Sequence, residues 1–387
     1  MGDIIGRDED VERLWRTLEH TSIRLNEVRR CGKSTALRLM KQRSPLGWLC
    51  VMTQVQDASS ADALVELILG ELMLHAGLPE KVKNVIRQFA KTFKSVAVKD
   101  TGIELADDFK TQPWRVLRQV MASVNAELEK DAKRLAIIVD EFPDALRAIA
   151  QRNPEAAAQV LALFRSARDN ESGSRVRWVL TGSIGFHHVT RTLPGHGEGM
   201  TDLVVEALPP LAPLWARHLA RCFLIGVGIE TKADEPAVAL LAERSDGIPF
   251  VLLMLVNQLH RSHTGLPASA AEADALLLAA ATNPMWDDAL TPLLAKVDDY
   301  YGQIASHAYS VLDAVAAAPM SRGDIAEHLA RAGLALADNG LRDLLRLLRD
   351  DHYLIRDDAD GSVSARVYRW RYPSLRDIWV ARQEAEA

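Results

Sequence analysis

The stretch SIRLNEVRRCGKSTALRLM, residues 22–40, decides the fold. Apolar residues alternate with polar ones over 23–26, which predicts a strand, and Leu37 and Met40 predict a helix after the Gly-Lys-Ser turn. A strand, a turn with Gly-Lys-Ser and a helix form the context of a phosphate-binding loop. Backbone N–H groups of such a loop face the phosphates, Lys33 would reach the terminal ones, and Ser34 would ligate Mg²⁺.

One residue of this loop departs from the usual pattern. The pattern begins with glycine, and this chain has Glu27 there. A side chain at that position hinders a tight turn, and a carboxylate near phosphates adds repulsion. The alternative interpretation is a Gly-Lys-Ser turn that opens an ordinary helix.

Composition narrows the class of protein. The chain has 387 residues, 48% of them hydrophobic, with a net charge of −6, which favours two or three globular domains and a nucleic-acid contact only through a local basic patch. No apolar run has the length of a membrane span, and the first residues lack the pattern of a secretory signal. We therefore expect no membrane partner. Cys31, Cys50 and Cys222 form no CxxC pair, so we also expect a reduced, cytoplasmic location.

A second signal lies about a hundred residues after the loop. Residues 134–141 form an apolar strand that ends in Asp140 and Glu141. Ligands of open α/β sheets bind at the carboxyl ends of the strands, so Asp140 would hold Mg²⁺ through water and Glu141 would polarise the attacking water. The alternative is a strand that merely exits into solvent.

The order of elements predicts an α/β fold with a parallel sheet. Residues 48–53 read as a strand, 61–74 as an apolar helix, 114–132 and 156–167 as helices, and 176–181 and 203–208 as strands. Thr181 ends the strand over 176–181 and Ser183 follows it. At this strand end, between the two expected sites in the fold, a small polar side chain can touch the γ-phosphate or its water. Four arginines surround the entry of this strand, where the nucleotide of a neighbouring subunit could be reached, and most of them are expected to be ordinary surface residues: Arg165, Arg168, Arg175 and Arg177.

Two further patterns are weaker. Basic residues alternate with apolar ones over 81–94, which predicts an amphipathic helix with either a solvated face or a nucleic-acid or partner contact. The pair His187-His188 has no Cys, Asp or Glu at ligand spacing and does not predict a metal site.

The second half of the chain is mostly helical after the boundary at Pro209-Pro210. A turn at Gly247-Ile248-Pro249 separates two apolar helices within 215–258, and Ser269 would cap a helix over 270–281. We therefore expect a core over 1–208, a helical lid over 209–297 and a third domain over 298–387.

The third domain reads as a winged helix. Helices are expected over 304–318, after a cap at 321–324, and from a cap at Asp338 or Asn339 through Arg349, followed by a hairpin of 353–356 with 363–368. The third helix places Arg342, Arg346 and Arg349 on one face. Acidic residues slightly outnumber arginines after residue 303, so a module for double-stranded DNA and a packing or protein-contact module both remain open.

Taken together, these residues resemble the P-loop ATPases of the AAA+/STAND superclass, of the archaeal-ATPase and origin-recognition-like type with a C-terminal winged helix. The pieces that carry the resemblance occur in family order: residues 5–9, 29–34, 137–141, 180–183, 247–249 and the winged-helix tail. The lid turn lacks the arginine that origin-recognition proteins usually place there, and Glu27 is the second departure.

The resemblance implies roles for individual residues. Ile5, Gly6 and Arg7 would lie near the adenine, and Pro249 in the lid turn would close over the base. Thr181 or Ser183 would be the sensor residue, and Arg168 an arginine finger, which implies an active site between subunits of a homo-oligomer formed on ATP binding. The loop residues expected on the nucleotide are Arg29, Arg30, Cys31, Gly32, Lys33, Ser34 and Thr35.

The function that follows is an ATP-dependent molecular switch that uses Mg²⁺, with hydrolysis through Glu141 and a winged helix that engages DNA or a protein partner. Two alternatives stay open. One is a nucleotide-binding scaffold that does not hydrolyse ATP, which Glu27 favours. The other is a DNA-loading or transposition-type ATPase in which the basic helix at 81–94 lines a channel.

Overall fold

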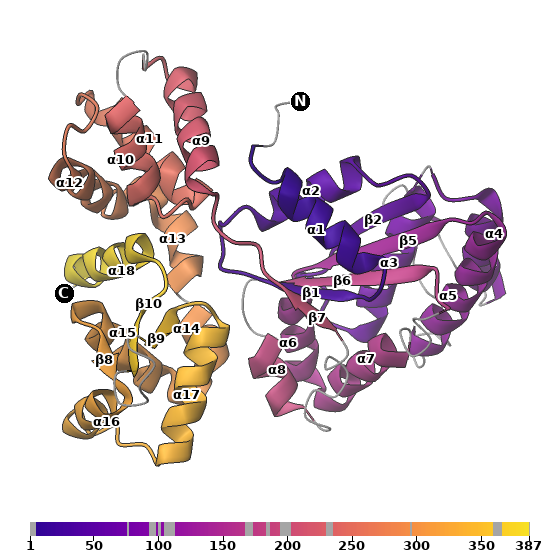
Figure 1. Cartoon of the computed structure of the whole chain (residues 1–387). Helices are drawn as coiled ribbons and strands as arrows, with labels where there is room; N and C mark the ends of the chain where they lie inside the picture. Colours follow the sequence, from indigo (N-terminus) through magenta and orange to yellow (C-terminus); the bar gives the residue numbers. More distant parts are fainter. Residues whose placement is uncertain are drawn as a thin grey trace. The chain divides into compact units, whose positions relative to one another are not determined.

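The chain folds into two compact units (Figure 1). The computed structural model describes residues 5–75, 77–92, 98–99, 102–103, 113–166, 173–182, 186–193, 203–229, 235–294, 296–358 and 366–386. The first unit contains Met1–Arg7, Glu27–Lys33 and Pro209–Ala387, and the second contains Asp8–Asn26 and Ser34–Leu208. The phosphate loop of the sequence analysis therefore groups with the C-terminal half. The division into three domains stays a prediction.

The second unit is built on a parallel sheet of five strands in the order β2-β5-β6-β1-β7. The strands are β1 (Ile23–Asn26), β2 (Trp48–Gln54), β5 (Arg134–Asp140), β6 (Val176–Gly182) and β7 (Val204–Glu206). Every residue of β6 and all but the first of β5 are buried, as expected for central parallel strands covered on both faces. A separate pair, β3 (Val98–Lys99) with β4 (Gly102–Ile103), is antiparallel.

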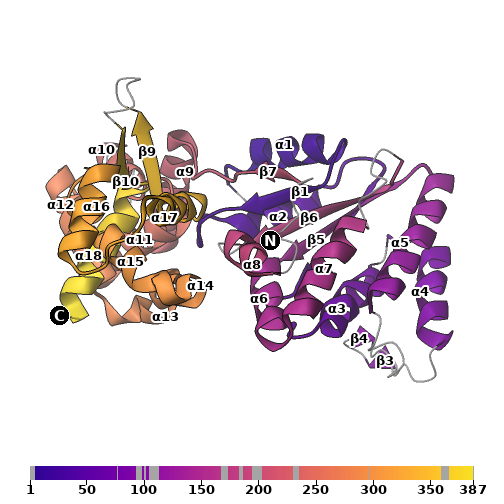
Figure 2. The same cartoon turned by 90° about the horizontal axis from the view of Figure 1, so that it is seen from below.

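Helices cover both faces of this sheet, with α1 on one side and α3, α6 and α7 on the other (Figure 2). The helices are α1 (Asp8–Leu18), α2 (Lys33–Gln42), α3 (Ala61–Leu74), α4 (Glu80–Thr92), α5 (Pro113–Lys130), α6 (Phe142–Arg152), α7 (Pro154–Ser166) and α8 (Phe186–Thr192). Helix α6 starts directly after the acid pair and was not predicted. Phe142 at its start packs edge-to-face on Phe164 of α7, with the ring centroids 4.9 Å apart. Phe164 packs in the same way on Trp178 of β6, with the ring centroids 5.1 Å apart. This buried aromatic group anchors the strand end that carries Asp140.

The basic amphipathic helix forms as α4, with Val82 and Ile86 buried and Lys81 exposed. Arg87 pairs with Glu80 at 3.0 Å and Lys83 pairs with the same carboxylate at 3.5 Å. The side chains of Lys91 and Lys94 lie outside the described residues. The described part of the helix therefore has its basic side chains partly neutralised, which favours the solvated-face interpretation.

The first unit begins, after the loop, with a helical part. Its elements are α9 (Pro213–Gly226), α10 (Glu235–Arg244), α11 (Pro249–Ser262), α12 (Ala270–Ala281), η2 (Pro284–Trp286), α13 (Asp287–Leu294), α14 (Lys296–Tyr301) and η3 (Gly302–Ile304). The predicted break between two apolar helices is the turn between α10 and α11. Ser269 caps α12 by accepting a hydrogen bond from the backbone N–H of Glu272, as predicted. Among the described helices, none is long and apolar enough to cross a membrane.

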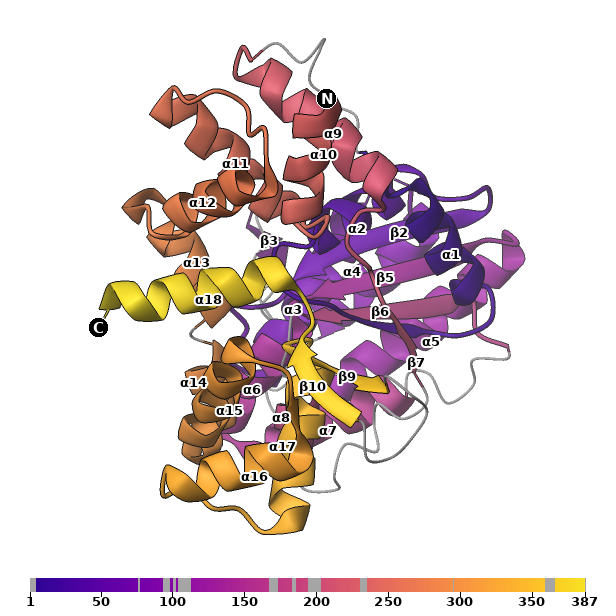
Figure 3. The ribbon, with the colours of Figure 1, turned by 60° about the vertical axis from the view of Figure 1, so that its left-hand side comes forward.

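The C-terminal part is a winged helix (Figure 3). Its elements are α15 (Ala305–Ala317), β8 (Met320–Ser321), α16 (Arg322–Arg331), α17 (Asp338–Asp350), β9 (Leu354–Asp358), β10 (Arg366–Trp370) and α18 (Pro373–Glu386). The predicted hairpin is β9 with β10, and the short strand β8 adds a third partner that was not predicted. The cap predicted for α17 was wrong. Ala337 is the N-cap, and Asp338 inside the first turn instead forms an ion pair with Arg342.

Candidate nucleotide site

The carboxyl ends of β5 and β6 bring together two of the predicted residues. Adjacent strands pair in register, with Val139 beside Leu180, so Asp140 and Thr181 end at the same edge of the sheet. Both side chains are fully buried, and Thr181 Oγ1 donates a hydrogen bond of 2.7 Å to Asp140 Oδ1. The backbone N–H of Glu141 donates to the same oxygen at 3.1 Å. One carboxylate oxygen is thus fixed by two donors.

The other oxygen of this carboxylate fits a metal ligand. Asp140 Oδ2 is buried and has no hydrogen-bond partner among the described residues. An unsatisfied buried carboxylate oxygen is costly unless a cation or an ordered water completes it. Mg²⁺ is held in such sites by one or two oxygen ligands together with phosphates and water. The described residues contain no group of three or more His, Cys, Asp or Glu that could hold a metal.

Glu141 occupies an unusual backbone position. It precedes α6 with φ of 57° and ψ of 35°, in the left-handed region that a side chain rarely adopts. Such strain persists where the surrounding structure holds it, and it often marks functional sites. The conformation turns the chain sharply out of β5, so that Glu141 is partly exposed beside the buried Asp140.

The predicted phosphate loop links β1 to α2, whose first residue is Lys33. Arg30 and Gly32 adopt positive φ values of 69° and 95°, so the backbone of the loop takes the left-handed region twice before the helix begins. Lys33 is buried and Ser34 is partly exposed at the first turn of α2. A loop of this kind directs backbone N–H groups and a helix N-terminus toward an anion.

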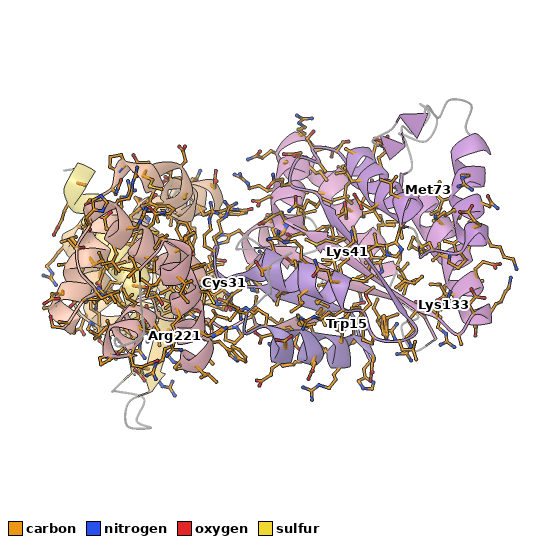
Figure 4. All side chains as sticks on the ribbon, turned by 90° about the horizontal axis from the view of Figure 1, so that it is seen from above. Trp15, Cys31, Lys41, Met73, Lys133 and Arg221 are labelled. Atoms are coloured by element: carbon orange, nitrogen blue, oxygen red, sulfur yellow. The ribbon has the colours of Figure 1, made fainter. Side chains whose placement is uncertain are left out.

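Cys31 lies at the centre of this loop and is labelled in Figure 4. Its side chain is fully buried. Burial, and then the charge of Glu27, raise the pKa of the Cys31 thiol to about 12. The backbone carbonyl of Cys31 accepts a hydrogen bond of 2.5 Å from Arg7, whose second nitrogen donates to the carbonyl of Pro209 at 2.7 Å. Arg7 therefore anchors the loop within the first unit.

The predicted lid turn lies beside the same loop. Gly247 has a φ of 68°, and a Cβ there would come within 2.3 Å of the backbone oxygen of Leu211, so only glycine fits. A Cβ at Gly32 would lie 3.7 Å from Cγ of Pro249, and Arg30 lies over the ring of Phe250 at 5.0 Å. The Gly-Ile-Pro turn and the loop are thus neighbours in the first unit.

The N-terminal residues predicted near the adenine also belong to this unit. Gly6 has a φ of 70°, and a Cβ there would lie 2.6 Å from Cβ of Trp215. Ile5 and Gly6 are partly exposed, while Arg7 is buried. Their contact with a base stays a prediction.

Glu27 is the departure from the usual loop, and it is completely buried. Its Oε1 accepts hydrogen bonds from the backbone N–H of Val28 at 3.1 Å and from the hydroxyl of Tyr372 at 3.4 Å. His352 Nδ1 lies 3.8 Å from the same oxygen. Burial, and then the charge of Glu27, raise the pKa of Tyr372. Neither Tyr372 nor His352 could be predicted from the sequence, because Tyr372, 345 positions from Glu27, reaches the loop only through the tertiary fold.

Two predicted residues lie outside the described part of the chain: Ser183 and Arg168. Most of the other arginines near β6 were expected at the surface, and Arg177 is the one that is buried among those that the structure describes. It is 5% exposed and donates to the carbonyls of Ser174 and Val176 at 2.8 and 3.1 Å, because the buried strand forces it to find internal acceptors. Arg177 is therefore not available to a neighbouring subunit.

Two of the three arginines predicted to contact DNA are paired with acids of the same helix. Arg342 and Arg346 are exposed, the first in an ion pair with Asp338 and the second with Asp343 at 3.0 Å. Arg349 is only partly exposed. Exposed ion pairs contribute little and open readily, so they weaken the electrostatic attraction of this face for phosphates without blocking it.

The comparison with solved structures identifies the fold. The Walker-type ATPase paby2304 of Pyrococcus abyssi matches with a TM-score of 0.63 and 19% identity, over 97% of this chain and 96% of that one. The ORC2 protein of Aeropyrum pernix, solved in ADPNP-ADP complexes, matches with a TM-score of 0.51 and 11% identity, over 100% of this chain and 95% of that one.

This chain has the fold of a P-loop ATPase of the archaeal, origin-recognition-like AAA+ type. The fold class predicted from the sequence is confirmed, together with its parallel core and C-terminal winged helix. At these identities the likeness concerns the fold alone. No family model matches the sequence, and no match was found among the curated proteins.

Proposed function

We propose that this protein is a nucleotide-operated switch that binds Mg-ATP at the loop before α2 and hydrolyses it slowly. The observation that carries the proposal is the Asp140 carboxylate, fully buried at the end of β5 with Oδ1 held by Thr181 and Oδ2 left without a partner among the described residues. A buried carboxylate prepared in this way is suited to a divalent cation. The likeness of the fold to a Walker-type ATPase supports the same site.

In this proposal, separate residues of the chain bind the phosphates, hold the metal and orient the attacking water. The backbone N–H groups after Gly32 and the ammonium of Lys33 bind the phosphates, while Ser34 and Asp140 hold Mg²⁺, which supplies charge neutralisation at the phosphates. Glu141, at the strand end beside Asp140, orients and polarises the attacking water. Thr181 keeps the Asp140 carboxylate in one rotamer.

The winged helix would report the state of the site to double-stranded DNA or to a protein partner. An association of subunits on ATP binding, as the arginine-finger prediction requires, and the cytoplasmic location remain part of this proposal. The adenine contacts of Ile5, Gly6 and Arg7, and the lid role of Pro249, belong to it as well.

The test compares nucleotide binding and phosphate release by the purified protein and three variants. Lys33→Ala should lose ATP binding, and Glu141→Gln should bind ATP but release no phosphate above background. Lys41→Ala is the matched control, because Lys41 is an exposed lysine in the last turn of the same helix (Figure 4). Wild-type binding that Lys33→Ala leaves unchanged would contradict the proposal.

A second function, a nucleotide-binding scaffold without hydrolysis, is favoured by one observation: the buried Glu27 in the phosphate loop. A carboxylate in this place weakens phosphate binding and misplaces the chemistry. A wild-type protein that binds ATP but releases phosphate no faster than Glu141→Gln would support the scaffold function over the hydrolysing switch.

A further inference from the structure

We propose that Tyr372 is a positioning residue that holds the Glu27 carboxylate on the phosphate loop, so that the C-terminal domain and the phosphates of a nucleotide compete for the loop. The inference rests on the proposed nucleotide site. It adds a residue from the far end of the chain that sets the affinity of that site.

The contact is part of a directed chain of hydrogen bonds. Arg371 Nε donates to the hydroxyl of Tyr372 at 3.0 Å, and this hydroxyl donates in turn to Glu27 Oε1 at 3.4 Å. Arg371 Nη1 lies 2.9 Å from Nδ1 of His352, the same nitrogen that lies 3.8 Å from Glu27. A guanidinium that donates to a hydroxyl polarises it and makes it a better donor. Arg371 therefore strengthens the hydrogen bond from Tyr372 to the Glu27 carboxylate.

The loop keeps the carboxylate close to its own backbone. Glu27 Oε1 also accepts from the N–H of Val28, while Oε2 has no hydrogen-bond partner among the described residues. A fully buried carboxylate with one oxygen unsatisfied is held in place by its few contacts rather than by solvent. Removal of the Tyr372 hydroxyl would leave the backbone N–H of Val28 as the remaining hydrogen-bond donor to Glu27 among the described residues, and the side chain could then turn away from the loop.

Electrostatics gives the direction of the effect. A triphosphate brings several negative charges to the loop that already carries Glu27, and like charges at short range in a dry site repel strongly. Binding must therefore displace or neutralise the carboxylate, which costs the contact with Tyr372. By linkage, anything that keeps this contact lowers the affinity for phosphates by the factor by which phosphates weaken the contact.

The position of Tyr372 makes the contact a coupling point. Tyr372 directly precedes α18, and the backbone N–H of Ser374 in the first turn of α18 donates to Asp246 at 2.6 Å, next to the glycine of the lid turn. Asp377, one turn later, forms an ion pair with Arg244. Movement of Tyr372 away from Glu27 is therefore transmitted to the lid turn through one helix start.

The first experiment measures dissociation constants of fluorescent ATP, ADP and AMP for the wild-type protein, Glu27→Gln and Tyr372→Phe. Glutamine keeps the shape and acceptor of Glu27 but removes its charge. We expect the Kd of ATP to fall about fivefold in both variants, that of ADP to fall less and that of AMP to stay unchanged. A purely structural role would not follow the number of phosphates.

Tyr309→Phe is the matched control. Tyr309 OH donates to Asp298 at 2.9 Å within the same C-terminal part, so this substitution also removes a tyrosine hydroxyl that donates to a carboxylate. Its removal should leave all three constants unchanged. Equal affinities of wild type, Glu27→Gln and Tyr372→Phe for ATP would overturn the proposal, as would weaker binding by the two variants.

A second experiment needs no nucleotide and keeps the two proposals separable. Alkylation of Cys31, followed by peptide mass spectrometry, should be about tenfold faster in Tyr372→Phe than in wild type or Tyr309→Phe, because a released loop exposes the buried thiol. The exposed Cys222 serves as the internal reference. Unchanged Cys31 rates overturn the hold on Glu27. Faster Cys31 alkylation with no ATP binding by any variant would leave the hold intact and overturn both the nucleotide site and the competition.

Discussion

Thr181 Oγ1 lies 2.7 Å from Asp140 Oδ1, and the two side chains, on adjacent parallel strands, have no exposed surface. The hydroxyl donates its only hydrogen to the carboxylate, so Thr181 acts through Asp140. The resemblance to AAA+ ATPases implied a sensor residue at Thr181 or Ser183, and the hydrogen bond favours a positioning role for Thr181 in the proposed site.

Thr181→Val should therefore weaken metal-dependent turnover more than nucleotide binding. Valine has nearly the same shape but leaves Asp140 Oδ1 with one donor, so we expect a loss of about 10- to 100-fold in phosphate release and a higher Mg²⁺ requirement. Steady-state phosphate release over a Mg²⁺ titration measures both. Thr181→Ser, which restores the hydroxyl, should recover most of the rate. A valine variant with wild-type turnover would show that Thr181 does not orient Asp140.

The capping box of α16 should contribute measurably to the stability of the winged helix. Ser321 Oγ accepts from the N–H of Asp324 at 3.2 Å, and the Asp324 carboxylate accepts from the N–H of Ser321 at 3.1 Å. Ser321→Ala should lower the free energy of unfolding by about 1 kcal/mol, measured by urea denaturation. Ser306→Ala, near the start of α15, is the comparison substitution. Equal midpoints for the two variants would argue against the cap.

The buried thiols should make the fold sensitive to alkaline pH. Burial raises the pKa of Cys31 and Cys50 from 9.0 to about 12. In the unfolded chain these thiols lose their protons near pH 9, while the folded protein keeps them to about pH 12. The unfolded state therefore binds fewer protons in this window. The contribution of the buried thiols to the free energy of unfolding is therefore fully present below pH 9. It is lost as the pH rises toward 12, by about 1.4 kcal/mol per pH unit for each thiol.

Urea midpoints at pH 8 and pH 10 for wild type and Cys50→Ala would check this expectation. This range precedes most tyrosine ionisation, which begins near pH 10 in an unfolded chain. The alanine variant should be less stable at pH 8 and should lose less stability between the two pH values. An identical decline in both proteins would place the sensitivity elsewhere.

Binding of duplex DNA by the winged helix should be weak and should depend little on salt. Arg342 and Arg346 must first leave their ion pairs with Asp338 and Asp343 before they contact phosphates. We expect a slope of log K against log salt of about −2, measured by fluorescence anisotropy. Asp338→Asn together with Asp343→Asn should tighten binding. Tight binding that survives Arg342→Ala and Arg346→Ala together would show that α17 is not the contacting helix.

The sequence by itself determined most elements and their order. Apolar runs, helical periodicity, caps and turn residues are local signals, so the strand over 134–140, the helices over 61–74 and 270–281 and the hairpin of the wing could be predicted. The Gly-Lys-Ser turn and the Asp140-Glu141 pair were found for the same reason. Parallel strands with helical crossovers then place the carboxyl ends of β1 and β5 at one sheet edge.

Only the tertiary structure decided what surrounds these residues. The hydrogen bond from Thr181 to Asp140 depends on the register of two strands about forty residues apart. The contact of Tyr372 with Glu27 depends on a fold that returns the end of the chain to its beginning. Side-chain contacts across such separations leave no periodic trace in the sequence, because any donor that reaches the acceptor satisfies it. The position of a carboxylate in the loop follows from the sequence alone, whereas its burial and its hydrogen bond with a tyrosine follow from the tertiary fold.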